Sequence, residues 1–455
     1  MRNRWVSAAA ALAGGMTVGQ TAVAADEGAA GLPDPSIATS LPREFGDPGG
    51  VRSALAKHGI LYGANYTGDV LGNVSGGVER SAHYAGLLEM YADIDLETLA
   101  GWRGLSLRAS GYQIHGTSIS GENLASLAAV SNVEAYPSTR LFELWLEQRL
   151  LDDRVAIRIG QVAADAEFFA ADGGGYFINS TFGWTAISSD NVPVGGPIYP
   201  IATPGARVSF EPNDNLKLMA GVWNGDPVGH CAEDLDPGQC NVHGLDFRLS
   251  DSPLLIVEGA YTYGRDGMGL PGTIKLGGWR HFGEFDDLRL NTAGGALGVA
   301  GGDPFVHSGN HGLYAVIDQM IYRFPYGGEG SGISVFGRVA GSPSDRNQID
   351  VYADAGVVVT GLFPSRPTDA FGFAFAYSGL SDDASAFDRD SGSAVVRDYE
   401  AVLEVSYTAE VVPGLYLQPD FQYFWHPGGH VPDPDDANEA VEDAAVIGLR
   451  TTVNY

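Results

Sequence analysis

Apolar and polar residues alternate along most of the chain from about residue 59 onward. The clearest case is residues 140–150, where one parity is almost entirely apolar and the other is mostly charged. The first parity holds Phe142, Leu144, Leu146 and Leu150, and the second holds Glu143, Trp145, Glu147 and Arg149. A period of two residues is typical of a β-strand whose two faces meet different surroundings. The same alternation recurs at 205–211 and 399–407, so the sequence predicts an all-β protein.

About seventeen segments fit a strand, but a single-chain bacterial barrel needs an even number. One of the candidate strands must therefore be wrongly assigned. We expect this error within 254–309, because short and long connections stop alternating there. We therefore predict sixteen strands, with eighteen as the alternative. The candidate segments are 59–71, 82–97, 103–115, 139–151, 153–162, 204–212, 215–224, 242–250, 254–264, 272–283, 311–324, 331–341, 347–361, 369–380, 398–410, 413–425 and 444–455.

The connections between these segments predict the architecture. Short turns, such as 211–216 and 249–253, separate much longer segments at about 116–138, 163–203, 225–241, 283–309, 381–397 and 426–443. This is the pattern of an antiparallel, up-and-down transmembrane β-barrel with short periplasmic turns and long outer loops. A series of soluble β-sandwiches would need several domains and linkers. We instead predict one barrel domain over 59–455, which ends in an amphipathic strand with Tyr455 last.

The N-terminal segments predict export. Residues 1–24 combine Arg2 and Arg4, an apolar run and the small-residue site Ala22-Val23-Ala24, as in a secretory signal peptide. Residues 25–58 are expected to form a periplasmic leader with a short helix, for which Asp47 before Pro48 is a candidate cap. No later stretch of 18 uncharged apolar residues is present, so any passage through a membrane must use strands.

A closed barrel places the polar parity in its interior, and sixteen to eighteen strands leave a water-filled lumen. Carboxylates and guanidinium groups there can bind sugar hydroxyls, and an aromatic ring can stack on a pyranose. The alternative for each residue is an ordinary ion pair of the wall. Arg158 and Arg338 are expected at the narrowest point. The inward candidates are Glu143, Trp145, Glu147, Arg158, Arg207, Arg338, Asp354, Glu400, Glu404 and Arg450.

The long segment 163–203 is expected to fold into the lumen and narrow it. Its glycine and proline content disfavours a strand, and its aromatic residues are unusual for a loop that faces only water. The alternative is a cap on the outer rim. The aromatic residues expected at the constriction are Phe168, Phe169, Phe182 and Trp184.

Composition and cysteines limit the partners. A formal net charge of −30 argues against nucleic acid. Cys231 and Cys240 are the only cysteines, and in an exported chain we expect them to form a local disulfide. Their spacing suits zinc poorly, and the acidic run 432–439 lacks the glycine of an EF-hand loop. We therefore expect neither a metal nor a cofactor.

Many of these segments resemble the carbohydrate-selective porin family of bacterial outer membranes. The resemblance rests on QIHG, PSTRLFELWLEQ, IRIGQVAADAEFF, FINSTFGW, GGPIYPIATPGARV, NGDP, LPGTIKLGGWRH, GLYAVIDQMIYR, GRVAGSPSDRNQID, LQPDFQYFWHPGG and GLRTTVNY. It runs from about Gly59 to Tyr455 and implies a sixteen-stranded barrel, an inward loop and passive diffusion of glucose-like mono- and disaccharides. The cysteine pair is a departure from the family pattern. The resemblance is compatible with both a homotrimer and a monomer.

Three other functions remain as alternatives. An enzyme is disfavoured because Glu143 and Glu147 lie roughly 13 Å apart along a strand, whereas a glycosidase pair lies about 5–9.5 Å apart. No G-x-S-x-G, HExxH or P-loop motif is present. A plugged or adhesive barrel would need a plug domain that the leader is too short to supply. A general or ion-preferring porin stays open, because acids in the loops dominate the net charge.

Overall fold

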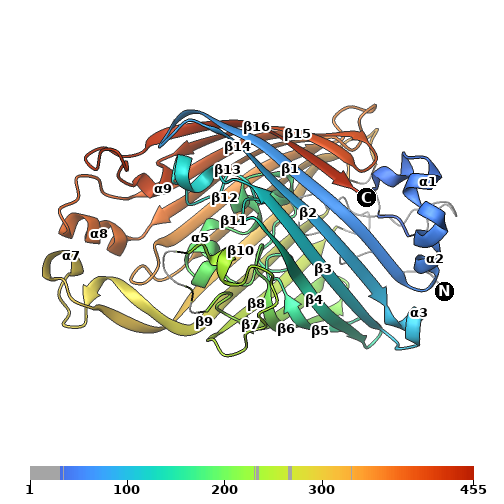
Figure 1. The fold of residues 1–455 in the computed structure, drawn as a ribbon, viewed down its shortest axis with the longest axis horizontal. Coiled ribbons are helices and arrows are strands. Elements are labelled where there is room, and N and C mark those ends of the chain that lie inside the picture. The colour runs from blue at the N-terminus through green and yellow to red at the C-terminus, as the bar shows by residue number, and fades with distance from the viewer. Residues whose placement is uncertain (1–30, 34, 230, 232–234, 265–268, 329) are drawn as a thin grey trace.

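In the computed structural model, residues 31–33, 35–229, 231, 235–264, 269–328 and 330–455 are described, and they form a closed β-barrel (Figure 1). The predicted signal peptide and the first part of the predicted leader lie outside these residues. The sheet has sixteen strands, each antiparallel to its neighbours in chain order, and β1 pairs with β16 to close it. This confirms the predicted fold class and strand number.

The strands have the following bounds: β1 Ile60–Gly77, β2 Ala82–Asp95, β3 Leu105–Gly116, β4 Ser138–Leu150, β5 Val155–Val162, β6 Thr203–Asn213, β7 Leu216–Asn224, β8 Pro253–Tyr263, β9 Gly272–Asn291, β10 Pro304–Arg323, β11 Gly332–Gly341, β12 Ile349–Thr360, β13 Ala370–Leu380, β14 Tyr399–Val412, β15 Leu415–Trp425 and β16 Glu442–Asn454.

On β4, inward and outward residues alternate as the sequence pattern predicts, except at Phe142. Leu144 and Leu146 are exposed on the outer surface, whereas Glu143 and Glu147 are buried inside. The prediction was wrong for Phe142, which is fully buried. Ser110 pairs with Glu143 and Gly111 with Leu141, so Phe142 has no partner on β3. This β-bulge inverts the parity before it.

The predicted strand 242–250 and the predicted turn 249–253 are wrong. Both lie in one long connection, 225–252, between β7 and β8. Leu245, Phe247 and Leu249 do alternate with polar residues, but they are exposed. The segment cannot join the barrel because β7 and β8 already pair directly. Removing this strand from the seventeen candidates leaves sixteen, and the segment 254–309, where we expected the error, contains three regular strands or parts of strands.

Long and short connections lie at opposite ends of the barrel. The long end carries α7 (Leu297–Ala300), α8 (Asp382–Asp390) and α9 (Pro427–His430), and the short end carries α3 (Leu96–Ala100) (Figure 1). The connection after β9 is shorter than predicted, because β9 extends to Asn291 and β10 begins at Pro304. The remaining short helices in loops are η3 Ser120–Leu124, η4 Gly173–Tyr176, α4 Ser180–Gly183, α5 Ala186–Asp190, η5 Pro193–Gly195 and α6 Pro237–Cys240. Within the described residues, no helix has the length and apolar character needed to cross a membrane.

The leader lies at the short end of the barrel and is helical. Asp47 precedes η2 but makes no capping side-chain hydrogen bond to it; it accepts instead from the backbone N–H groups of Arg52 at 2.8 Å and Ser53 at 3.4 Å, in the first turn of α2. The Ser53 hydroxyl also donates to it and lowers the pKa of the Asp47 carboxyl. The leader consists of η1 Ile37–Thr39, α1 Arg43–Gly46, η2 Pro48–Gly50 and α2 Val51–Lys57.

The closing seam between β1 and β16 contains a buried ion pair. Arg450 donates from Nε and Nη2 to the two oxygens of Asp69, each at 2.8 Å. Arg450 also donates to Asn132 at 2.7 Å, and Ser131 donates to Asp69 at 2.6 Å. The connection 117–137 therefore contacts both strands of the seam from the inside.

Candidate functional site

The connection 163–202 lies inside the barrel, where inward carboxylates hold its backbone (Figure 1). Glu258 on β8 accepts from the N–H of Phe169 at 2.9 Å. Glu404 on β14 accepts from the N–H groups of Ile178 and Asn179, at 2.6 and 2.9 Å. The connection thus crosses the interior from β5 to β14, and we refer to it as the inward loop.

Aromatic side chains fill the space between the inward loop and the wall. Phe169 stacks on Tyr314 of β10, with ring centroids 4.2 Å apart, and Phe168 meets Trp223 of β7 edge to face at 5.5 Å. Phe182 is fully buried, and Trp184 packs beside the same cluster. The four aromatic residues predicted at the constriction therefore fasten the loop to the barrel.

Arg338 on β11 is the main cationic anchor of the inward loop. It donates to Asp354 at 2.6 and 2.9 Å and to the carbonyl oxygens of Thr181 at 2.7 Å and Gly183 at 2.6 Å. The side chains of Arg338 and Asp354 are 0% exposed. A solute in the channel cannot touch either one in this conformation, which corrects the expectations that Arg338 lies at the narrowest point and that Asp354 lines the lumen. Sequence parity found their inward direction but not the loop that covers them.

Glu400 anchors a second segment in the same way. Its carboxylate accepts from the N–H groups of Leu127 and Ala128 in the connection 117–137, both at 2.8 Å, and from the N–H of Gly428 at 2.7 Å. Glu400, Glu404 and Arg450 are buried. These three predicted lumen residues are therefore structural supports of the loops.

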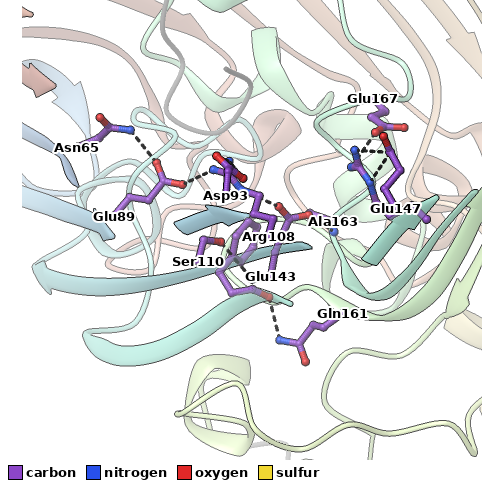
Figure 2. Close-up of polar contacts among 12 residues, drawn as sticks. Asn65, Glu89, Asp93, Arg108, Ser110, Glu143, Glu147, Gln161, Ala163 and Glu167 are labelled. Carbon is purple, nitrogen blue, oxygen red and sulfur yellow. Dashed lines mark hydrogen bonds and ion pairs between the residues drawn. The ribbon is translucent and has the colours of Figure 1, made fainter. Parts of the chain in front are cut away.

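The remaining predicted residues lie together on the wall formed by β2 to β6, in two adjoining clusters of arginines and carboxylates (Figure 2). In the first, Arg108 of β3 binds Asp93 at 3.0 Å and Glu89 at 3.3 Å, both on β2, and lies 3.8 Å from Glu143 of β4. Glu143 also accepts from the N–H of Ala163 at 3.0 Å, where the inward loop begins.

The second cluster joins three strands and the inward loop. Glu147 of β4 faces Arg158 of β5, which in turn faces Arg207 of β6 in the strand register. Glu147 binds these arginines at 2.9 and 3.0 Å. Glu167 of the inward loop binds Arg158 at 2.8 Å and also contacts Arg207, and Arg149 lies 3.3 Å from Glu147. Each charged side chain of this cluster therefore forms at least one ion pair.

Trp145 connects the two clusters. It pairs with Arg108 in the β3–β4 register, and the Arg158 guanidinium carbon lies 3.9 Å from the centroid of its ring. This cation–π contact covers one ring face, so Trp145 orients Arg158. Its predicted role as a stacking platform for sugar stays a prediction.

We call these nine charged residues the charged wall; three of them remain accessible to water, and the other six are buried. The side chains of Asp93, Arg149 and Glu167 are 30%, 31% and 18% exposed. Glu89, Asp93, Arg108, Arg149 and Glu167 were missing from the predicted site. Strand alternation around Arg108 could have revealed it, whereas no sequence signal places Glu167 opposite two arginines. The members are Glu89, Asp93, Arg108, Glu143, Glu147, Arg149, Arg158, Glu167 and Arg207.

The structure also joins Cys231 to Cys240 by a disulfide in the connection 225–252, with Cα atoms 5.7 Å apart. This is the local clip expected from the sequence. Arg140 on β4 donates to the carbonyl oxygen of Asn241 at 2.8 Å, directly after the clipped segment.

A closed barrel with an apolar exterior and a polar, loop-narrowed interior is the architecture of an outer-membrane porin. The sequence profile described as "Carbohydrate-selective porin, OprB family" matches residues 79–455. The chain belongs to this family, and it is a carbohydrate-selective channel of the bacterial outer membrane.

Individual relatives agree with this assignment over nearly the whole chain. Porin B of Pseudomonas aeruginosa is 25% identical over 436 residues, which cover 89% of this chain and 90% of that protein. The putative porin QuiX of Acinetobacter baylyi is 22% identical over 441 residues, covering 90% and 92%. The high-pH structure of Pseudomonas putida OprB has the same fold, with a TM-score of 0.78, 22% identity and coverage of 90% of this chain and 97% of that one.

Proposed function

We propose that small uncharged sugars, of mono- or disaccharide size, diffuse passively along the charged wall on their way to the periplasm. The charged wall lies on the side of the lumen where inward side chains pair with one another and with Glu167, and where water still reaches several of them. The leader, at the end with short connections, then lies on the periplasmic side. We assign no catalytic step to the chain.

The balance of charge on this wall is the observation that carries the proposal. The charged wall contains four arginines and five carboxylates, although the whole chain has a formal net charge of −30. A nearly balanced surface of paired charges exerts little net attraction on an ion. It still offers donors and acceptors at close spacing, and a sugar hydroxyl can use both at once.

The test is single-channel conductance of the refolded protein in planar bilayers, with glucose, a disaccharide and an organic anion added in turn. We expect glucose and the disaccharide to reduce the ionic current in a saturable way. The anion should reduce it only weakly. A channel that conducts but shows saturable block by the anion alone would favour the ion-preferring alternative. Absence of conductance would overturn the proposal.

A further inference from the structure

Two histidines and one aspartate meet at the outer rim of the barrel, away from the charged wall. His426 directly precedes the short helix α9 between β15 and β16 and His430 is its last residue, and Asp398 directly precedes β14 (Figure 1). One ligand atom from each of the three lies within 4.8 Å of the others. The side chains of His426, His430 and Asp398 are 28%, 34% and 47% exposed, so dissolved ions can reach them.

The distances within this cluster are close to the spacing that a metal ion imposes. Asp398 Oδ1 lies 2.8 Å from Nδ1 of His426 and 3.7 Å from Nδ1 of His430. Bonds of about 2.0–2.1 Å to a tetrahedral ion place neighbouring ligand atoms about 3.4 Å apart. The two observed distances bracket this value, and the ligand atoms of all three residues lie within 4.8 Å of one another.

The backbone is shaped to bring the two imidazoles together. His426 and His430 have φ angles of 49° and 70°, which residues other than glycine rarely adopt. Gly428 and Gly429 between them also have positive φ. As a result the two rings stack, with centroids 4.1 Å apart and an interplanar angle of 24°.

Hydrogen bonds hold the three residues in place from outside the cluster. The N–H of His426 donates to Asp443 at 2.9 Å. The N–H of Asp398 donates to the carbonyl oxygen of Gly429 at 3.0 Å. Residues 431–443 contain six acidic residues and no lysine or arginine, which raises the local concentration of cations.

We propose that Asp398, His426 and His430 form a site for a divalent late first-row transition metal, of which Zn²⁺ is the ion to test. Two imidazoles and one carboxylate are a ligand set that zinc accepts with water at the fourth position. Imidazole ligands select such metals over Ca²⁺ and Mg²⁺, which prefer oxygen.

Metal binding at this site would stabilise the rim segments next to Glu400, which supports the connection 117–137. Glu400 follows Asp398 by two residues, and its carboxylate accepts from Gly428, between the two histidines. The same carboxylate holds Leu127 and Ala128 of the connection 117–137. A bound ion therefore ties together the rim segments that flank this support.

The experiment is isothermal titration of the refolded full chain in detergent with zinc chloride near pH 7.5. The test variant is H426N/H430N, because asparagine tolerates the left-handed backbone and should preserve the fold. The control variant is H58N/H311N, which removes two exposed histidines outside the cluster. Heat-dependent electrophoretic mobility verifies that each variant forms a barrel.

We expect one zinc ion per chain in the unmodified protein and in the control. Changes around metal ligands commonly weaken binding by about 10–100-fold, so loss of both imidazoles should weaken it by at least about tenfold. D398N provides a second variant and should also reduce the affinity. The proposal fails if the unmodified chain shows no saturable binding. It also fails if H426N/H430N binds zinc as tightly as the control.

Discussion

Two sectors of the barrel wall carry similar inward residues but use them differently. In the sector from β8 to β15, Glu258, Arg338 and Glu404 bind the backbone of the inward loop. In the sector from β2 to β6, Arg108 and Arg158 bind mainly carboxylate side chains. An inward charge thus binds the loop backbone in the first sector, whereas in the second it mainly pairs with other charged side chains, of which Asp93, Arg149 and Glu167 are partly exposed.

The largest effect should come from Arg338→Ala. The substitution leaves Asp354 buried without its partner and removes the donors to Thr181 and Gly183. Breaking a buried ion pair costs about 3–5 kcal/mol, so denaturant unfolding should show a large loss of stability. Freed from this anchor, the inward loop should also give a noisier and larger single-channel conductance.

The matched control is Val339→Ala, one residue further along β11 and exposed on the lipid-facing surface. It should leave the conductance unchanged. Glu404→Gln tests the same idea at the opposite wall, where a carboxylate accepts from two N–H groups of the loop. If both R338A and E404Q conduct as quietly as the unmodified channel, the two sectors do not differ as described.

A smaller effect is expected from the charge-balanced pair E147Q/R158Q on the charged wall. It keeps the net charge but breaks the buried ion pairs that position the partly exposed side chains of Arg149 and Glu167, which a sugar can reach. Block of the current by glucose should weaken roughly tenfold, which corresponds to about 1.4 kcal/mol. The measurement is glucose titration in planar bilayers.

The comparison pair for this variant is R338Q/D354N, which likewise removes one arginine and one carboxylate in the other sector. It should affect stability and channel noise more than the concentration of glucose needed for half-block. Equal weakening of glucose block by both pairs would contradict the assignment of sugar passage to the charged wall.

The smallest effect is expected for Trp145→Phe. The smaller ring retains a π face but holds the Arg158 guanidinium less well than the indole, now 3.9 Å away. Cation–π contacts contribute about 0.5–1 kcal/mol at exposed sites, so glucose block should weaken by roughly twofold to fivefold in the same titration. An unchanged half-block concentration would show that Trp145 neither orients Arg158 for sugar nor contacts sugar.

The fold was predictable because the alternation is a direct consequence of lipid on one side of a strand and water on the other. The prediction failed where the alternation of apolar and polar residues does not correspond to the pairing of strands in the sheet. Residues 242–250 alternate without a free sheet edge to join, and Phe142 lies at a bulge that only the β3–β4 register reveals. Both features depend on a neighbouring strand, so the local pattern cannot report them.

The site was predictable only in part, for a related reason. Parity gave the inward direction of Arg158, Arg207 and Arg338, but the position of the inward loop decides which of them a solute can approach. Likewise, the spacing of His426 and His430 is visible in the sequence. Their meeting with Asp398, which is distant along the chain, depends on the way β14 and β15 pair.

The seam between β1 and β16 bears on how the protein is assembled. Asp69 and Arg450 come from opposite ends of the barrel domain, and both bind residues 131–132 inside it. Insertion of this segment and joining of the first and last strands therefore stabilise one another. A precursor in which β1 and β16 are not yet paired would lack the contacts that hold residues 131–132 inside the barrel. Closure of the barrel and narrowing of the channel should therefore occur in the same late step of biogenesis.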